Sequence, residues 1–155
     1  MNPRYLRGFA ALLMGSALNH FGDRLLGVKT ELFYGLGTFN FSWILDIFFV
    51  PFLVGLAVAW IFGYGAWWLS YFPPLIVRCL SYVDVYSSSD IPEGSTLIPL
   101  GWWGFFVILT MESAAIGGIV GEVFIKKVYH RENRHLLGPQ GIPPSLASRN
   151  EAADD

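Results

Sequence analysis

The run WWGFFVILTMESAAIGGIVGEVFI, residues 102–125, contains only two charged side chains, Glu112 and Glu122. About twenty apolar residues are enough for a helix to cross the hydrocarbon core of a bilayer. Two tryptophans begin the run and two lysines, Lys126 and Lys127, follow it, as is typical where a membrane helix meets the headgroups. The sequence therefore predicts a membrane span over residues 102–125.

A similar run covers residues 43–62. Twenty residues that each rise 1.5 Å give roughly 30 Å, the thickness of the hydrocarbon core. Ser42 is the expected N-cap, and Asp46 falls in the first turn, where the helix dipole tolerates an anion. Pro51 predicts a kink in mid-helix. Six tryptophans are expected to anchor the chain at the membrane interfaces: Trp43, Trp60, Trp67, Trp68, Trp102 and Trp103.

The whole chain of 155 residues has the composition of a membrane protein. Hydrophobic residues make up 54% and charged residues 14%, against about 25% charged in an average soluble domain. A net charge of −2 gives no basic field that would attract nucleic acid. The single cysteine, Cys79, excludes a disulfide within the chain. These features exclude an ordinary cytosolic enzyme, a disordered regulator and a disulfide-rich secreted domain.

Residues 1–40 show the three- and four-residue spacing of apolar side chains that is typical of an amphipathic helix. The spacing extends from Tyr5 to Leu32, with basic and polar residues in between. The purely apolar run, Gly8–Asn19, has twelve residues and is too short to cross the hydrocarbon. We therefore expect an interfacial helix with its basic side toward lipid phosphates. A spanning helix over about residues 5–26 is the alternative.

Residues 66–83 are apolar and aromatic, but Pro73 and Pro74 interrupt them and Arg78 would be costly in hydrocarbon. We expect a short broken segment that lies at the membrane surface or re-enters it, with a helix from Pro74 to about Tyr82. A third span over residues 66–83 is the alternative. The polar residues that follow, as far as Pro99, predict an aqueous loop.

These segments predict an all-α integral membrane protein built on a two-span transmembrane helical hairpin. Residues 1–40 form the interfacial N-terminal segment, residues 41–125 the transmembrane domain, and residues 126–155 an extended tail rich in Gly and Pro. In this topology nine of the ten basic residues, Arg24 and Lys29 included, lie on the side of the two termini. The positive-inside rule then places both termini on the cytoplasmic side of an energy-transducing inner or cytoplasmic membrane.

Glu112 is the candidate functional residue, because it lies near the middle of the span over residues 102–125. A carboxylate there costs several kcal/mol unless it is paired, protonated or hydrated. It could serve a proton relay or lie beside a quinone or ion path. It could equally be a neutral side chain that is hydrogen-bonded to a neighbouring helix. Glu122 and Lys126, four residues apart, are expected to form an ordinary exposed pair.

Small residues recur every fourth position along the same span. They form two adjacent rows: Ser113, Gly117 and Gly121, and beside them Ala114 and Gly118. Such a stripe lets another helix approach closely. The stripe therefore predicts a helix contact, either with residues 43–62 or with another subunit.

No motif for catalysis, for metal binding or for nucleotide binding occurs in the sequence. We expect a chain that is not an enzyme and binds no cofactor by itself. The expected function is that of a non-catalytic accessory subunit of a larger membrane complex, in contact with other integral membrane subunits and with lipids, and not with nucleic acid. Two alternatives remain: a subunit of a respiratory or photosynthetic electron-transfer complex with Glu112 near a quinone or proton path, and a small oligomeric transporter or channel protomer.

Overall fold

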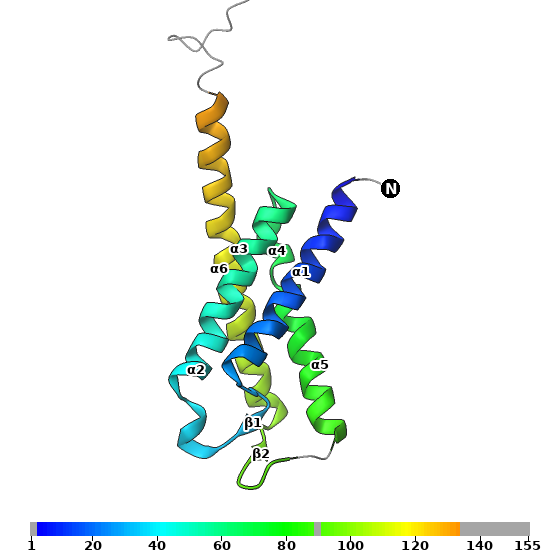
Figure 1. Cartoon of the computed structure of the whole chain (residues 1–155), viewed down its shortest axis with the longest axis vertical. Helices are drawn as coiled ribbons and strands as arrows, with labels where there is room; N and C mark the ends of the chain where they lie inside the picture. The colour runs from blue at the N-terminus through cyan, green and yellow to red at the C-terminus, as the bar shows by residue number, and fades with distance from the viewer. Residues whose placement is uncertain (1–2, 89–90, 134–155) are drawn as a thin grey trace, which may run out of the picture. The chain divides into compact units, whose positions relative to one another are not determined.

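The computed structural model of the chain describes residues 3–88 and 91–133. Four long helices carry most of these residues (Figure 1): α1 (Pro3–Leu26), α3 (Val50–Phe62), α5 (Phe72–Ser88) and α6 (Leu100–Asn133). The shorter elements are β1 (Leu32–Phe33), η1 (Gly35–Thr38), α2 (Phe41–Ile44), η2 (Leu45–Phe49), α4 (Ala66–Leu69) and β2 (Thr96–Leu97). The chain divides into two compact units after Glu122. The helix contacts described here lie in the first unit.

Two helical stretches are long and apolar enough to cross a membrane, judged by length and composition. The first joins α2, η2 and α3 into one stretch, Phe41–Phe62, with a mean hydropathy of 2.4. The second is Leu100–Lys126 of α6, with a mean hydropathy of 1.7. The predictions of a mostly helical fold and of two apolar helices are confirmed at this level. The predicted hairpin is wrong, because Phe48, Phe52 and Ala59 meet Ser113, Gly117 and Gly121 in the same order, so the two stretches run parallel. Of the predicted tail over residues 126–155, the structure describes residues 126–133, which continue the helix α6. The rest of the tail lies outside the described residues.

The first apolar stretch begins two residues earlier than expected and is irregular near its start. Asn40, and not Ser42, is the N-cap, and its side chain accepts a hydrogen bond from the backbone N–H of Trp43 at 2.9 Å. A π-helical turn, η2, precedes Pro51, which has no N–H to donate. Across the interface, the Ser113 hydroxyl of α6 donates to the carbonyl of Phe48 at 2.5 Å. This bond fixes α6 against the turn that precedes Pro51.

α1 runs antiparallel along α3, and a row of glycines separated by seven residues faces that helix. A methyl group on Gly22 would lie 2.5 Å from Val50, and one on Gly15 would lie 2.8 Å from Pro73 of α5. Only glycine leaves room for this approach. The facing pairs are Gly8 with Phe62, Gly15 with Val58, and Gly22 with Val50.

The outward face of α1 differs from the amphipathic pattern expected for residues 1–40. The apolar side chains that carried the expected spacing are exposed rather than packed on the protein: Tyr5, Leu6, Phe9, Leu13, Phe21 and Leu25. The buried side of the helix is instead small and polar, because Gly15 and Asn19 face α3 and α5. α1 therefore lies along a candidate span. Arg24 and Lys29 lie near the N-terminal end of α3, at Val50, whereas the start of α1 lies near the C-terminal end of α3.

The segment over residues 66–83 is broken as expected, but at another place. α3 ends at Gly63, whose φ of 85° favours glycine, and the short helix α4 follows. The break lies at Ser70 and Tyr71, and the two prolines fall in the first turn of α5, where a missing N–H costs little. α5 consequently continues to Ser88, beyond the expected end at Tyr82.

The end of the first unit away from Phe62 is closed by a small sheet and an apolar cluster. β1 and β2 pair antiparallel, with Leu32 opposite Leu97. The backbone N–H of Ile98 then donates to the carbonyl of Glu31 at 2.9 Å. The buried members of the cluster are Trp43, Ile47, Ile98 and Phe106. This end of the unit holds the loop of residues 27–31 in place beside α1 and α5.

Candidate functional site

The Arg78 guanidinium is buried inside the helices and joins three parts of the chain that are distant in sequence. It lies on α5, and only 2% of its side chain is exposed. Its Nη2 donates to Asp46 of η2 at 2.6 Å and to Asp23 of α1 at 3.0 Å. Its Nη1 donates to the Thr30 hydroxyl, in the loop after α1, at 2.8 Å. One cation therefore ties α1, η2 and this loop to α5.

Further polar side chains extend this buried network. The Thr30 hydroxyl donates to Glu31 at 3.2 Å, and the amide of Asn19 lies 3.4 Å from Asp23. Asn19, Glu31 and Asp46 are fully buried. We call Asn19, Asp23, Thr30, Glu31, Asp46 and Arg78 the Arg78 network.

The Arg78 network has more negative than positive groups, and several of its atoms lack partners. It contains three carboxylates, of Asp23, Glu31 and Asp46, and one guanidinium. Within the described residues, four of its buried atoms make no hydrogen bond: Asn19 Oδ1, Glu31 Oε2, Asp46 Oδ1 and Arg78 Nε. Buried polar atoms in native proteins are nearly always partnered by protein or by ordered water. Four buried atoms of the network therefore lack the partner that a buried polar atom usually has.

The position of Asp23 gives it an unusual electrostatic environment. It lies outside both candidate membrane spans, in the last turn of α1. Burial raises the pKa of Asp23 above its usual range, and the nearby charges of Asp46 and Glu31 raise it further. The Arg78 guanidinium opposes this effect but does not overcome it. The neutral form of Asp23 is therefore favoured in the folded chain.

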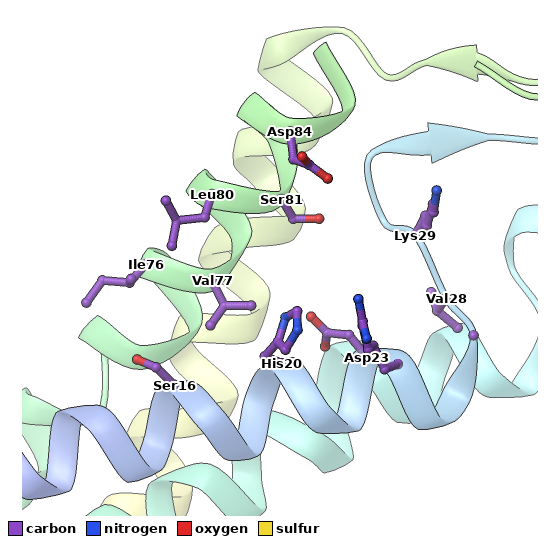
Figure 2. A pocket seen from close by; sticks show the side chains of 12 residues that line it. Ser16, His20, Asp23, Val28, Lys29, Ile76, Val77, Leu80, Ser81 and Asp84 are labelled. Atoms are coloured by element: carbon purple, nitrogen blue, oxygen red, sulfur yellow. The ribbon is translucent and has the colours of Figure 1, made fainter. Parts of the chain in front are cut away.

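A groove of about 820 Å³ between α1 and α5 leads to Asp23 (Figure 2). His20 and Asp23 point into it from α1, and Val77 and Ser81 face them from α5. Its other lining residues are Ser16, Arg24, Gly27, Val28, Lys29, Ile76, Leu80 and Asp84. Asp23 belongs both to the groove and to the Arg78 network. The groove is therefore a route by which water can reach the network.

The carboxylates of the Arg78 network are arranged around a cation of the chain itself. Among the described residues, no three His, Cys, Asp or Glu side chains are arranged to hold a metal ion. The Arg78 guanidinium instead forms ion pairs with the carboxylates of Asp23 and Asp46. Asp23 and Asp46 therefore depend on the same nitrogen of a single cation.

The structure places Glu112 away from this network, on the outward face of α6. Its side chain is exposed, and the Tyr71 hydroxyl donates to it at 3.4 Å, which is long for a bond between two oxygens. Glu122 also contacts the neighbourhood of α4, where it accepts a hydrogen bond from the backbone N–H of Trp67 at 3.0 Å. Glu112 and Glu122 therefore belong to separate contacts.

The small residues of α6 face helices of the same chain. Gly117 lies against the backbone of Phe52, and Ala114 lies against Gly55 of α3. A methyl group on Gly121 would lie 2.6 Å from Ala59. The sequence alone does not identify the helix that packs on this stripe, and in the structure that helix is α3. The Ser70 hydroxyl, in the turn after α4, also contacts the stripe at Gly118. Ser113 belongs to the same interface through its bond to Phe48.

The six tryptophans fall into two groups. Trp60, Trp67, Trp68 and Trp102 are exposed, as interfacial anchors would be. Trp43 is instead buried in the apolar cluster, edge to face with Phe106 at 5.1 Å between ring centres. Trp103 packs beside that cluster and on Tyr82, with 4.6 Å between ring centres. Trp43 therefore belongs to the buried core of this end, and Trp103 is partly buried at its edge.

Sequence reasoning missed the Arg78 network. Arg78 was noted as costly in a membrane, and that cost is itself a signal that an acidic partner must exist. The partners could not be named, because Asp46 and Asp23 lie 32 and 55 residues away along the chain. Asp46 was assigned to the helix dipole instead of to an ion pair. Comparison of the chain with protein-family models, with curated proteins and with solved structures finds no match.

Proposed function

We propose that this chain is a non-catalytic accessory subunit of a larger membrane protein complex. In this proposal α3 and α6 cross the membrane in the same direction, so the chain returns between them through α5, and the outward face of α6 binds a helix of another subunit. The position of Glu112 on that face carries the proposal. The membrane is an energy-transducing inner or cytoplasmic membrane, in which such complexes are common.

The outward face of α6 is apolar except at Glu112. Four large apolar side chains on this face are exposed to between 49% and 57%: Phe105, Ile108, Ile116 and Ile119. Their spacing places them in one stripe along the helix, with Glu112 at its centre. Lipid tails would cover the apolar side chains well, but they offer nothing to the carboxylate. An ionised carboxylate in hydrocarbon costs several kcal/mol, unless a partner satisfies it.

The partner that fits this face is a transmembrane helix with a hydrogen-bond donor or a cation at mid-depth. A Lys or Arg side chain would pair with Glu112, and a Ser, Thr or Asn side chain would donate to it. Tyr71 occupies part of this role within the chain, but over a long contact of 3.4 Å. The partner helix would cover the stripe and leave Glu112 with a complete set of contacts.

The small-residue stripe does not supply the docking face, since it is used within the chain. Gly117, Gly118 and Gly121 pack on α3 and the segment after it. The face available to another subunit is therefore the opposite one. This arrangement supports a subunit that is held rigid internally and presents an apolar surface outward.

The contacts along α3 also support a topology in which the chain enters and leaves on one side. Gly8, near the start of α1, and Gly121 of α6 both lie near the C-terminal end of α3, at Phe62 and Ala59. Arg4 and Arg7 come just before Gly8 in the sequence and therefore belong to this end. We propose this end as the cytoplasmic side. Arg24 and Lys29 do not add to the charge bias, because they lie beyond the other end.

The test is to solubilise the protein gently from its native membrane and to identify by mass what co-purifies with it. We expect distinct subunits at fixed stoichiometry. Glu112→Leu should reduce their recovery at least tenfold, whereas Ile116→Leu on the same face should leave recovery unchanged. Recovery that is insensitive to Glu112→Leu would contradict the proposed docking face.

The same experiment separates the two alternative functions. Partners that carry quinone-linked or haem-linked redox groups would assign the chain to an electron-transfer complex. A homo-oligomer without other subunits would overturn the accessory role and favour a small transporter or channel protomer. In that case ion or proton flux, measured with Glu112→Gln against the unmodified chain, would be the decisive comparison.

A further inference from the structure

The Arg78 network is independent of the α6 face and contains more acid than its single cation can neutralise. If all its groups were ionised, three carboxylates and one guanidinium would leave two net negative charges. Such a charge is unfavourable in a buried site, where the interactions are weakly screened. Protonation of at least one carboxyl group is the simplest way to lower it.

The geometry indicates which carboxyl groups hold the proton. Asp23 and Asp46 both accept from the same nitrogen, Nη2 of Arg78, at 3.0 and 2.6 Å. Their oxygens are thus brought close together without a second cation between them. Asp46 also has a buried oxygen, Oδ1, with no partner among the described residues. This oxygen can accept a hydrogen bond from a protonated Asp23.

We propose that the Arg78 network is a proton-binding site, in which Asp23 holds a proton beside Asp46 and exchanges it with water through the groove between α1 and α5. Asp23 is the exchanging group, because it lines the groove and its side chain is 12% exposed. Asp46 is fully enclosed and communicates with the groove only through its neighbours.

The charged groups around Asp23 come from every element packed against it. His20 and Arg24 lie on α1, and Lys29 and Glu31 lie in the loop that follows. Arg78 and Asp84 lie on α5, and Asp46 lies on η2. Burial and the two neighbouring carboxylates raise the pKa of Asp23, which supports retention of the proton under neutral conditions. Loss of the proton would leave an added negative charge in the site.

The test is infrared spectroscopy of the full chain in detergent, which detects the C=O band of a protonated carboxyl group. A Glu112→Gln background removes the carboxyl group that lies within the apolar outward face of α6. We expect a protonated band to persist near neutral pH, far above the value of about 4 that is ordinary for Asp. Asp23→Asn should abolish this band, and Asp84→Asn, in the same groove, should leave it in place.

Absence of the band near neutral pH would overturn the proposal, as would its survival in Asp23→Asn. Thermal unfolding gives a second readout that does not need the band. Because the raised pKa of Asp23 means that the folded chain retains a proton that the unfolded chain releases, stability should fall as pH rises from the acidic range through neutrality. Asp23→Asn should flatten this dependence. An equal pH dependence in Asp23→Asn and in the unmodified chain would also contradict the proposal.

Discussion

At the scale of single residues, Arg78 is the side chain on which the described fold depends most. It contacts α1, η2 and the loop before β1 at once. Arginine suits this role because its planar guanidinium offers five donors in fixed directions and stays charged when buried. A lysine at the same position would present a single point charge and could not reach the same partners together.

We expect Arg78→Met to destabilise the chain by about 3–5 kcal/mol, because it leaves the buried carboxylates without their cation. Arg78→Lys should lose less, since it keeps the charge. Thermal unfolding in detergent measures both effects. Arg78→Met combined with Asp46→Asn should recover part of the loss, because one uncompensated charge is removed. A midpoint unchanged in Arg78→Met would contradict the assigned role.

A second prediction at this scale concerns Ser113. Its hydroxyl donates to the carbonyl of Phe48, beside the π-helical turn. Ser113→Ala should cost about 0.6 kcal/mol, the average for hydrogen bonds between membrane helices, and at most about 1.7 kcal/mol. Ser81→Ala, on the groove side of α5, is the matched control and should change stability less. Equal effects of the two substitutions would show that the bond to Phe48 contributes no special stability.

At the scale of elements, close helix contact at glycine explains how four helices of limited length pack together. Glycines at intervals of seven residues along α1 contact α3, and small residues at intervals of four along α6 contact the same helix. Close approach increases van der Waals contact, which drives helix association where no hydrophobic effect operates between apolar helices. α3 is therefore the central element of the first unit.

We expect Gly117→Ala to destabilise the packing of α6 on α3, because the new methyl group would meet the Phe52 backbone, which cannot move aside without shifting the helix. Gly104→Ala in the same helix is the control, since nothing lies within 4 Å of a methyl group there. That control should be neutral or stabilising by up to about 1 kcal/mol, because Ala favours the helix. Unfolding midpoints of the two variants in detergent should differ in this order. The opposite order would contradict the packing described.

The elements show what a sequence pattern can and cannot indicate. The runs over residues 43–62 and 102–125 were predictable, because length and apolar content alone define them. The orientation of α1 was not predictable from its periodicity. An apolar stripe looks the same whether it faces lipid or protein, and Gly15 and Gly22 reveal the buried side only once α3 is beside them. The length of α5 was underestimated, because prolines in a first turn resemble prolines that interrupt a helix.

The candidate sites follow the same physical logic. Glu112 could be identified, because one carboxylate within an apolar run is visible in the sequence itself. The Arg78 network could not, because its members come from α1, a loop, η2 and α5. Only the folded arrangement brings those segments together. Local spacing therefore predicts features of one helix, and the sites between helices require the tertiary structure.

At the scale of the whole molecule, the described surface is largely apolar along the outward sides of α1 and α6. An exposed apolar surface of this kind calls for lipid or protein to cover it. We expect the chain to remain in the membrane fraction after extraction at high pH, which releases peripheral proteins. Release into the supernatant would contradict insertion of α3 and α6 in the bilayer.

The contact proposed for the α6 face can be tested directly in intact membranes. A photo-crosslinking amino acid in place of Ile116, one turn from Glu112, should form an adduct with a single protein other than this chain. The same group in place of Leu36, which is 93% exposed in η1, should not form that adduct. An accessory subunit docked through α6 predicts this result. Adducts at Ile116 with lipid alone, or only with a second copy of the chain, would contradict it.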